Sequence, residues 1–570
     1  MTIRNGSFAA IVTGMTFCQA VAWGISVTGR VYLDVNANGL PDAGEPGVSR
    51  VAVSDGAKVV VTDVSGAYRL EIPETSALVW ISRSSGHAVS GAFWRFTDGS
   101  GTVDFGLTAQ EQTSDFTFMQ ITDAHIGAAD KVKRLGDSVG RLPFKIDFLV
   151  NTGDLLGDAQ GVPPDKASEP YKLALETMRS FRLPQFHVPG NHEHVAFLVK
   201  DADTGHPNYG KRLYRKLLGP TYYSWDWAGV HFIALDGTML QQDRHYQERL
   251  GEVQLGWLRQ DLNLLPADKP VILFCHQVIA DLRDANELAE ILRGSKVLGA
   301  FCGHIHTNYT VPFLDFTVYV SGALSGAWWS APNFDGTPQG YRLIRIKGGS
   351  MKTVYTNRDV FSPVAIISPR ASDVVSGYVE AEAAVVDFGQ TCTVKAEFSG
   401  QPVAMRQISR EELWSFWRGT VDTRLTNDGI CALKMAVNRD VSPDGYEVRY
   451  LVENGKREPF LAKGPAVLVL QTRGIRENIE VLLNGKALGT IPAGTTNETQ
   501  LTFSVSPELL QRMNRVTLRG PKQTTARYSV GPVWLAYQGK KIYDPRSAAF
   551  ERYRIGGGEL CEKVIYHVLP

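Results

Sequence analysis

Residues 116–125, FTFMQITDAH, place an aspartate and a histidine directly after a short apolar run. Residues 297–306, VLGAFCGHIH, do the same with two histidines. Polar side chains also follow apolar runs of strand length at residues 148–154 (FLVNTGD), 186–193 (FHVPGNHE) and 271–276 (VILFCH). Amphipathic stretches of helical length lie between these runs, at residues 171–181, 253–265 and 285–293. The alternation predicts an α/β sheet covered by helices.

Five clusters of metal-type ligands result, each at the carboxyl end of a predicted strand. They are Asp123-Ala-His125, Gly153-Asp154, Gly190-Asn191-His192-Glu193, His276 and Gly303-His304-Ile-His306. Singly, each has an ordinary explanation as a solvated loop, a turn or a structural histidine. In an open α/β sheet, however, the strand-to-loop exits converge on one crevice, so five such placements predict one site.

The residue types in these clusters indicate a metal site. Carboxylate, imidazole and amide-oxygen ligands suit divalent Zn, Mn or Fe. The seven candidate ligands in these clusters are too many for one tetrahedral zinc but fit two ions that share a carboxylate. Two ions about 3.5–4 Å apart can hold a hydroxide, polarise phosphoryl oxygens and steady both ends of an in-line displacement. We therefore expect two divalent metal ions.

In chain order, the motifs DxH, GD, GNHE, H and GHxH resemble the signature of the calcineurin-like metallophosphoesterases, over residues 113–360. The resemblance implies that one metal is held by Asp123, His125 and His306. It implies that the other is held by Asn191, His276 and His304, and that Asp154 bridges both. His192 would protonate the leaving oxygen or stabilise the transition state. The implied fold is a four-layer αββα sandwich.

A narrower resemblance follows the last motif. The segment Ser321–Trp329 (SGALSGAWW), then Asp335-Gly-Thr-Pro and Gly340-Tyr341, is similar to a bacterial subgroup with an extra β-domain before the catalytic domain and one or more after it. Gly157 stands three residues after Asp154, where a purple acid phosphatase would have tyrosine, so that branch of the family is not expected.

Three further residues are candidates for the substrate pocket. Trp328 and Trp329 follow the last ligand loop and could wall the pocket or stack on a sugar or base. The alternative is local core packing. His194 lies two residues after His192 and could meet phosphate, although a histidine in such a loop is more often a surface residue.

The regions outside the catalytic segment are predicted to be all-β, because short strands alternate with Gly-, Asp-, Ser- and Pro-rich turns. We expect an N-terminal β-sandwich at residues 23–112, an immunoglobulin-like β-domain at 361–460 and a second sandwich at 461–570. An Asn484-Gly485 pair predicts a hairpin turn in the last of these. Cys392 and Cys431 could form a disulfide in the C-terminal region, while Cys275 and Cys302 are expected to be buried, inert thiols.

A candidate calcium loop lies in the N-terminal region. Oxygen-bearing side chains recur at the spacing of a calcium loop, at Asp34, Asn36, Asn38, Asp42 and Glu45, with a glycine at the sixth position. The flanks are strand-like, so it is not an EF-hand, and it resembles calcium-associated turns of bacterial surface β-domains. The competing interpretation is a polar turn that binds nothing.

Composition and the first residues bear on location. Lys+Arg and Asp+Glu both number 59, which does not favour nucleic-acid binding. Residues 1–22 are predicted to be a signal peptide, with one charge at Arg4, an apolar run and small residues at 20–22. The alternatives are a poorly ordered domain start or, through Cys18, a lipoprotein, which bulky Phe17 disfavours. No other apolar run is long enough to span a bilayer, so we expect export to the periplasm or beyond.

These features predict a dinuclear-metal phosphoester hydrolase that acts outside the cytoplasm by attack of metal-bound hydroxide. A phosphodiesterase is favoured, with an envelope glycan, a lipid or a nucleotide as the substrate. One alternative is a phosphomonoesterase for phosphate scavenging. The other is a binding or adhesion protein with a vestigial core, which the complete ligand set disfavours. The oligomeric state is not predicted.

Overall fold

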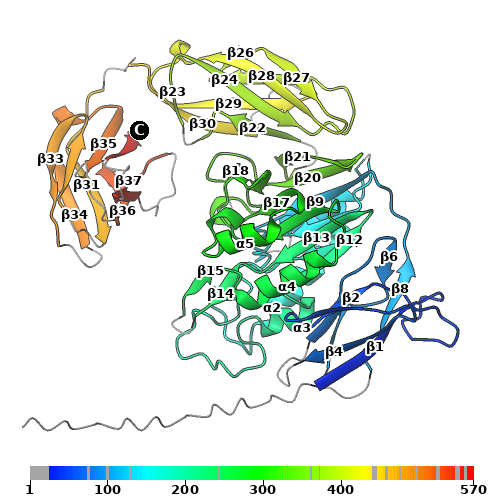
Figure 1. The fold of residues 1–570 in the computed structure, drawn as a ribbon. Helices are drawn as coiled ribbons and strands as arrows, with labels where there is room; N and C mark the ends of the chain where they lie inside the picture. Colours follow the sequence, from blue (N-terminus) through cyan, green and yellow to red (C-terminus); the bar gives the residue numbers. More distant parts are fainter. Residues whose placement is uncertain are drawn as a thin grey trace, which may run out of the picture. The chain divides into compact units, whose positions relative to one another are not determined.

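The computed structural model describes residues 25–569 except for residues 73–77, 98–101, 128–129, 143, 242–243, 330–331, 360–362, 372, 439–445, 456–459, 474, 476, 495–498, 521–526, 546–552 and 557–561. The predicted signal peptide at 1–22, with Cys18, lies outside the described residues, so export stays a prediction. Figure 1 shows the helices and strands with their labels. The chain divides into two compact units. One comprises the residues up to Gln112 together with Gly256–Leu265, and the other comprises Thr113–Leu255 and Pro266–Pro570.

The first unit contains two four-stranded sheets. One has the order β4 (Ala67–Ile72), β1 (Ile25–Leu33), β8 (Phe105–Ala109), β6 (His87–Val89), and the other the order β3 (Val59–Val61), β2 (Ala52–Ser54), β5 (Leu78–Ile81), β7 (Trp94–Phe96). Residues on β4 alternate between buried and exposed, as expected of a strand with one face against a core. Val31 and Phe105 of one sheet share a hydrophobic cluster with Val53 and Ile81 of the other. The prediction that this region is all-β is therefore confirmed for its described residues.

Two sheets form the centre of the second unit. The first has the order β11 (Gln185–His187), β10 (Phe148–Asn151), β9 (Phe116–Ile121), β20 (Gly340–Lys347), β21 (Ser350–Asn357). The second has the order β12 (Tyr223–Trp227), β13 (Val230–Leu235), β16 (Pro270–Cys275), β17 (Lys296–Cys302), β19 (Phe316–Val320), β18 (Tyr309–Phe313). Strands β9, β10 and β11 are parallel, and so are β13, β16, β17 and β19.

Aromatic side chains join the two central sheets. Phe118 of β9 stacks on Phe148 of β10, with ring centroids 4.8 Å apart. The same ring meets Phe232, Phe274 and Phe301 of the second sheet edge-on, at 5.7, 6.0 and 6.2 Å. The opposite face of the first sheet shares a hydrophobic cluster with α1 (Asp130–Val139) and α2 (Ser168–Met178). Strands covered on both faces are continuously apolar, which explains the runs seen in the sequence.

Most predicted elements of this region are confirmed to within a few residues. The predicted helix at 171–181 begins earlier, at Ser168, and ends in a 3₁₀ turn over Arg179–Phe181. Helices α4 (Glu252–Asn263) and α5 (Ala285–Leu292) were predicted, whereas α1, α3 (Arg212–Leu218) and the hairpin of β14 (Thr238–Leu240) with β15 (Tyr246–Glu248) were not. Helix α1 has few apolar residues and α3 has seven residues in all, so neither carries a clear periodic pattern.

Two further pairs of sheets follow. The first pair is here called the flanking sheet pair. One of its sheets has the order β22 (Val364–Ser368), β24 (Tyr378–Val385), β28 (Ser415–Asp422), β27 (Met405–Arg410). The other has the order β23 (Val374–Val375), β30 (Tyr446–Val452), β29 (Gly429–Val437), β25 (Val394–Phe398), β26 (Gln401–Val403). One hydrophobic cluster includes residues of both of its sheets.

The second pair is here called the terminal sheet pair. One of its sheets has the order β34 (Thr499–Val505), β31 (Ala466–Arg473), β36 (Arg527–Tyr537), β37 (Lys540–Ile542), and β38 (Tyr553–Gly556) also pairs with β36. The other has the order β33 (Lys486–Ile491), β32 (Ile479–Leu483), β35 (Met513–Arg519), β39 (Glu562–Val568). The predicted Asn484-Gly485 turn joins β32 to β33, with φ of 50° and 83° at its two residues. Positive φ at both positions is what a tight two-residue hairpin requires.

The suggested disulfide between Cys392 and Cys431 is not formed. Both are free thiols, as are Cys275 and Cys302, among the cysteines that the structure describes. Cys392 Sγ lies 3.9 Å from a carboxylate oxygen of Asp387, while Cys431 Sγ lies 3.5 Å from Thr426 Oγ1. Cys275 and Cys302 are buried at strand ends as predicted, and burial raises the pKa of the Cys302 thiol to about 12.

None of the helices in the described part of the chain has both the length and the apolar character needed to cross a bilayer.

A buried histidine should make the stability of the terminal sheet pair depend on pH. His567 of β39 is fully buried, its Nδ1 lies 2.9 Å from Ile542 O, and burial lowers its pKa to about 4. An unfolded histidine has a pKa of about 6.5, so as pH falls the unfolded chain takes up the proton first. The stability that neutral His567 provides is therefore complete above about pH 6.5 and is lost as pH falls towards 4.

The His567→Asn variant tests this, because asparagine keeps a donor near Nδ1 and does not titrate. Between about pH 7.5 and about pH 5, the unfolding free energy of the native protein should fall by about 2 kcal/mol more than that of the variant. Urea unfolding, followed by the exchange of amides in β35 and β39, measures the difference. Equal pH dependence in the two proteins would show that His567 does not contribute.

Candidate active site

The five predicted clusters lie in loops at the carboxyl ends of parallel strands. Asp123 and His125 follow β9, Asp154 follows β10, and His276 follows β16. Asn191 and His192 follow β11, and His304 and His306 follow β17. Hydrogen bonds tie these loops together: Asp123 N donates to Gly153 O at 3.0 Å within the loops of the first sheet, and His304 N, from a loop of the second sheet, donates to Asp123 Oδ2 at 3.0 Å. The loops of both sheets therefore meet at one edge.

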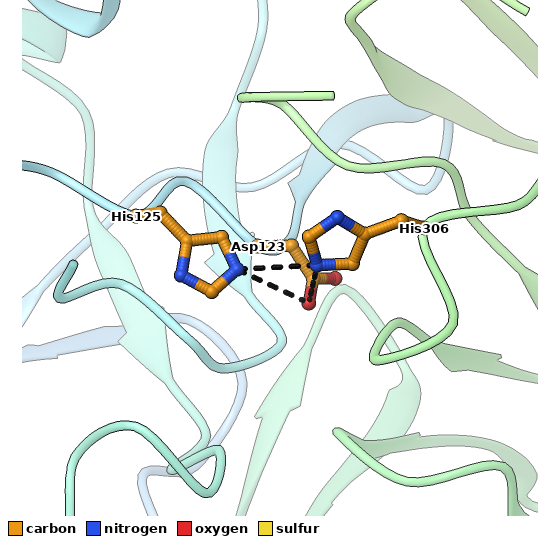
Figure 2. Close-up of side chains that lie close together, drawn as sticks. All are labelled: Asp123, His125 and His306. Carbon is orange, nitrogen blue, oxygen red and sulfur yellow. Dashed lines mark hydrogen bonds and ion pairs between the residues drawn. The ribbon is translucent and has the colours of Figure 1, made fainter. Parts of the chain in front are cut away.

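Asp123, His125 and His306 form the first group of converging side chains, and Figure 2 shows them pointing at one another. Asp123 Oδ1 lies 3.2 Å from His306 Nε2 and 3.9 Å from His125 Nε2. The two histidine Nε2 atoms are 3.2 Å apart. Three ligand atoms from two different loops thus surround one point.

Asp154, His276 and His304 form the second group, in which the ligand atoms lie within 4.8 Å of one another. His276 Nε2 is 3.2 Å from Asp154 Oδ2. The same Oδ2 atom lies 3.9 Å from His125 Nε2, which belongs to the first group. Asp154 is therefore placed between the two groups, as a bridging ligand would be.

Unsatisfied polar atoms in the cluster fit divalent metal ions. In the described part of the chain, no hydrogen-bond partner reaches the buried Oδ1 atoms of Asp123 and Asn191 or the buried Nε2 of His276. His276 Nδ1 lies 2.8 Å from Thr152 O, and His306 Nδ1 lies 3.1 Å from Gly326 O. Donation from Nδ1 to a carbonyl leaves the Nε2 lone pair directed into the site, which is how metal-binding histidines are usually oriented.

The backbone at five of the seven predicted ligands has a positive φ. The values are 50° at Asp123, 43° at His125, 50° at Asp154, 71° at His304 and 51° at His306. The left-handed region is uncommon for residues other than glycine, and such strain gathers at functional sites. Because five occur in one cluster, the loops are shaped for the side chains that they present.

Two motif glycines are required by close approach. A Cβ at Gly190 would lie 2.1 Å from Asp154 Oδ1, and one at Gly303 would lie 1.9 Å from Thr122 Oγ1. Thr122 Oγ1 in turn donates to Asp123 Oδ2 at 2.7 Å. Any larger residue at either glycine would displace a predicted metal-binding carboxylate.

The buried carboxylates are kept ionised by the imidazoles around them. Burial alone would raise the pKa of Asp123, but His306 and His276 hold that pKa below its ordinary value. The pKa of Asp154 is likewise lowered, against the effect of burial, chiefly by His276. Burial would lower the pKa of His276, yet the charges of Asp154 and Asp123 raise it to about 10. Two buried carboxylates thus need positive charge beside them. Divalent cations bound to the neutral imidazoles would supply that charge in place of the imidazolium protons.

His192 lies at the edge of the cluster. Its Nε2 is 3.8 Å from Asp154 Oδ2, and its Nδ1 is 2.8 Å from Gly157 O. Its side chain is 22% exposed, whereas that of His125 is 1% exposed. Geometry groups His192 with His125 and Asp154 as a further possible metal site, so its role as an acid stays a prediction.

Glu193 is a structural residue that sequence reasoning passed over. This buried carboxylate accepts hydrogen bonds from Asp154 N at 3.0 Å, Leu156 N at 3.1 Å and Gly190 N at 2.5 Å. Its backbone carbonyl accepts from Tyr171 OH at 2.6 Å. Glu193 therefore fixes the Asp154 loop against the Asn191 loop. The only signal in the sequence was its place beside Asn191 and His192.

Glu248 was also missed. It ends β15 in the unpredicted hairpin, and its Oε1 lies 3.4 Å from His304 Nε2. The hydrogen bond to His304 lowers the pKa of Glu248. A carboxylate on one imidazole nitrogen orients the other, so Glu248 would direct His304 Nδ1 towards the site. No motif surrounds Glu248 in the sequence.

The predicted pocket residues have different environments. The Trp329 ring lies 5.1 Å from the His125 ring and 6.1 Å from the His192 ring, and the residue is 47% exposed with a φ of 66°. The side chain of Trp328 lies outside the described part of the chain. His194 is fully buried, with its Nδ1 3.1 Å from Asn191 O, and burial lowers its pKa to about 4. Trp329 is thus at the surface of the cluster, whereas His194 supports Asn191.

The candidate calcium loop is held together by its own side chains. Asp34 accepts from Asn38 N at 3.1 Å and Gly39 N at 2.9 Å. Glu45 accepts from Val35 N and Asp42 N, both at 3.0 Å. Asn36 and Asn38 both donate to Asp42, at 2.7 and 2.8 Å. The five predicted oxygen donors lie in one loop, and calcium binding stays a prediction.

The comparisons with known proteins agree with this geometry. Residues 116–308 match the family model described as calcineurin-like phosphoesterase. The matched residues contain all seven predicted ligands. They also contain the parallel strands of both central sheets except β19. The chain therefore carries a calcineurin-like phosphoesterase domain, and the resemblance seen in the sequence is confirmed.

Phosphodiesterases are among the similar proteins. A probable cyclic nucleotide phosphodiesterase of Rhodococcus erythropolis is 28% identical over 212 residues, which is 35% of this chain and 64% of that protein. A cAMP/cGMP dual specificity phosphodiesterase of Mycobacterium tuberculosis is 26% identical over 38% of this chain and 69% of its own length. A probable glycerophosphodiester phosphodiesterase of Arcobacter nitrofigilis is 26% identical over 33% of this chain and 71% of its own length. The chain thus spans less than two thirds of the first of these relatives.

Solved structures match over a similar share of the chain. GAP50, described as the anchor in the inner membrane complex of Plasmodium, aligns with a TM-score of 0.30 at 15% identity, over 43% of this chain and 85% of its own. A predicted phosphoesterase of Streptococcus pneumoniae aligns with a TM-score of 0.23 at 13% identity, over 43% and 91%. Scores of this size do not bear on function. The family match and the phosphodiesterase relatives support a metal-dependent phosphoester hydrolase.

Proposed function

We propose that this protein is a dinuclear-metal phosphodiesterase. The observation that carries the proposal is the convergence of two ligand groups on Asp154, whose Oδ2 lies 3.2 Å from His276 Nε2 and 3.9 Å from His125 Nε2. One ion would be held by Asp123, His125 and His306, and the other by Asn191, His276 and His304. Two such ions would activate water and offset the charge that develops on the phosphoryl oxygens.

The chain's own residues prepare the reaction in several ways. Carbonyl oxygens fix the Nδ1 atoms of His276 and His306, so that their Nε2 atoms face the cluster. Glu193 holds the two ligand loops together through backbone N–H groups. Such preorganisation lowers the cost of reorienting groups as the transition state forms.

His192 is proposed as the acid that protonates the leaving oxygen. Its Nδ1 hydrogen bond to Gly157 O holds the ring in place and leaves Nε2 on the Asp154 side. Its partial exposure would allow a substrate oxygen to reach Nε2. A general acid positioned in this way typically contributes about 10²–10⁴-fold in rate.

A phosphodiester is preferred as the substrate because the similar proteins are a cAMP/cGMP phosphodiesterase, a probable cyclic nucleotide phosphodiesterase and a probable glycerophosphodiester phosphodiesterase. The alkoxide leaving group of an alkyl phosphoester gains most from protonation by His192, in diesters and monoesters alike. An extracytoplasmic substrate, such as an envelope glycan, a lipid or a nucleotide, rests on the predicted signal peptide alone. A phosphomonoesterase would use the same ligands.

Parallel assays of the metal-reconstituted protein on bis-p-nitrophenyl phosphate and p-nitrophenyl phosphate test the proposal, with both Mn and Zn. We expect diester turnover to exceed monoester turnover and Asp154→Asn to be inactive. The reverse preference would make the protein a phosphomonoesterase. Absence of bound metal would contradict the enzyme hypothesis altogether.

The finer architecture belongs to the same proposal. We infer a four-layer αββα catalytic domain at 113–360, a β-sandwich at 23–112, an immunoglobulin-like domain at 361–460 and a terminal sandwich at 461–570. Support comes from the hydrophobic clusters that contain residues of both sheets in each flanking region. Calcium in the N-terminal loop is supported by the two buried carboxylates of Asp34 and Glu45.

A further inference from the structure

A short loop beside the metal cluster, here called the Asp335 loop and comprising residues 333–337, contacts a predicted ligand directly. Phe334 N lies 3.0 Å from His306 O, to which it donates. The rings of Phe334 and His306 are 6.2 Å apart. Two residues beyond His306, Asn308 N donates to Asp335 Oδ2 at 3.1 Å. The position of the His306 segment therefore depends on this loop.

The Asp335 loop is itself held from outside the catalytic region, by the flanking sheet pair. Tyr446, the first residue of β30, donates from its hydroxyl to Gly336 O at 2.6 Å. Ala371 N donates to Asp335 O at 3.0 Å. Gly336 has a φ of 81°, and a Cβ there would lie 2.4 Å from Ala371 Cβ, so the two segments are in close contact. Residues far along the chain thus complete the support of a ligand loop.

On its other side the loop is anchored in the first central sheet. Asn333 Oδ1 accepts from Ala323 N at 2.8 Å, and Asn333 Nδ2 donates to Pro338 O at 2.7 Å and to Tyr355 OH at 2.9 Å. Asp335 is 5% exposed, and its Oδ1 accepts from Thr337 Oγ1 at 2.7 Å. Because these side chains are hydrogen-bonded, the loop is held rigidly. A displacement at Tyr446 would therefore also move His306.

The flanking sheet pair also packs firmly on the catalytic region. Phe388 stacks on Phe144 with ring centroids 4.9 Å apart. Val386 and Trp414 belong to the same hydrophobic cluster as Leu343 of β20. Arg345 and Lys347 of β20 form ion pairs with Glu412, at 3.3 and 3.0 Å. Tyr446 is therefore presented by a fixed support.

We propose that Tyr446 is a positioning residue of the active site, which acts through Gly336 and the Asp335 loop on His306. The flanking sheet pair would then be part of the catalytic apparatus and not an independent binding module. This inference deepens the proposed function, on which it rests, because His306 matters to hydrolysis only if it holds a metal ion.

The neighbouring tyrosine on the same strand supplies a matched control. Tyr450 donates its hydroxyl to Pro369 O at 2.8 Å, within the flanking sheet pair, and Tyr446 donates to the catalytic loop. Tyr446→Phe and Tyr450→Phe each remove one hydroxyl from β30, and each should destabilise the fold to a similar extent through the loss of one hydrogen bond to a carbonyl. Only Tyr446→Phe should alter the metal site.

Two measurements on the full chain distinguish the outcomes. Mn²⁺ binding by equilibrium dialysis should be weakened about tenfold in Tyr446→Phe, which is the lower end of the effect of outer-shell partners, and unchanged in Tyr450→Phe. Amide hydrogen exchange over residues 303–308 should be faster in Tyr446→Phe alone. Gly336→Ala, which forces the loop away from Ala371, should change both quantities in the same direction.

Equal Mn²⁺ affinity and equal exchange in the two tyrosine variants would overturn the inference. The failure of the proposed function is distinguishable from this result. If the native protein binds Mn²⁺ but hydrolyses no phosphoester, dialysis still tests the role of Tyr446. If the native protein binds no metal, the proposed function fails, and the exchange experiment alone decides whether Tyr446 controls the His306 loop.

Discussion

Asp154→Asn is expected to abolish hydrolysis and to weaken the binding of both metal ions together. The Asp154 carboxylate lies between the two ligand groups, 3.2 Å from His276 Nε2 and 3.9 Å from His125 Nε2. An amide is a weaker ligand and carries no charge to balance the cations. Metal ions supply several kcal/mol to phosphoryl transfer, so turnover should fall by at least about 10³-fold.

Metal content by plasma emission spectrometry and diester turnover, measured on the same preparations, check this result. Asp137→Asn, at an exposed position of α1, is a suitable control for the substitution itself. Retention of two ions by Asp154→Asn, with activity lost, would show that Asp154 acts in the reaction without bridging the metals. Retention of activity would contradict the dinuclear site.

His192→Ala is expected to reduce kcat by about 10²–10⁴-fold and to leave both metals in place. The loss should be greater for an alkyl leaving group than for p-nitrophenolate, because the poorer leaving group depends more on protonation. This dependence separates an acid from a residue that only shapes the pocket.

The metal content of His192→Ala decides between the two roles that the geometry allows. His192 lies close enough to His125 and Asp154 to join them as a ligand. His304→Ala, which removes a predicted ligand, provides the reference for metal loss. If His192→Ala loses an ion to the same extent, His192 is a ligand and another group must protonate the leaving oxygen.

The strands and the ligand cluster could be predicted because one physical rule governs both. The run FTFMQI is apolar throughout because β9 is covered on both faces, and Asp123 follows it because the carboxyl ends of parallel strands meet. The same reasoning placed Asp154 and His276 correctly at strand ends. In each case the residue and its strand are adjacent in the sequence.

The supporting residues could not be predicted, since their partners are distant or belong to the backbone. Glu193 accepts hydrogen bonds from backbone N–H groups of the Asp154 loop. Almost every residue type has a backbone N–H group, so the sequence does not indicate these partners. Glu248 lies on a short hairpin with no motif, and Tyr446 reaches Gly336 from a different pair of sheets. Helix α1 escaped prediction because its sequence, DKVKRLGDSV, is largely polar.

The left-handed backbone of the ligand loops restricts how this site could change during evolution or design. Asparagine, aspartate and histidine are the side chains that tolerate positive φ best after glycine, and they are also ligands of borderline and hard metals. Exchanges among these three at Asp123, His125 or His306 would alter the metal preference at little cost to the loop conformation. Valine, isoleucine or threonine there would oppose the backbone itself. New metal specificities are therefore most accessible through exchanges among asparagine, aspartate and histidine, because the backbone conformation already accepts these three residues.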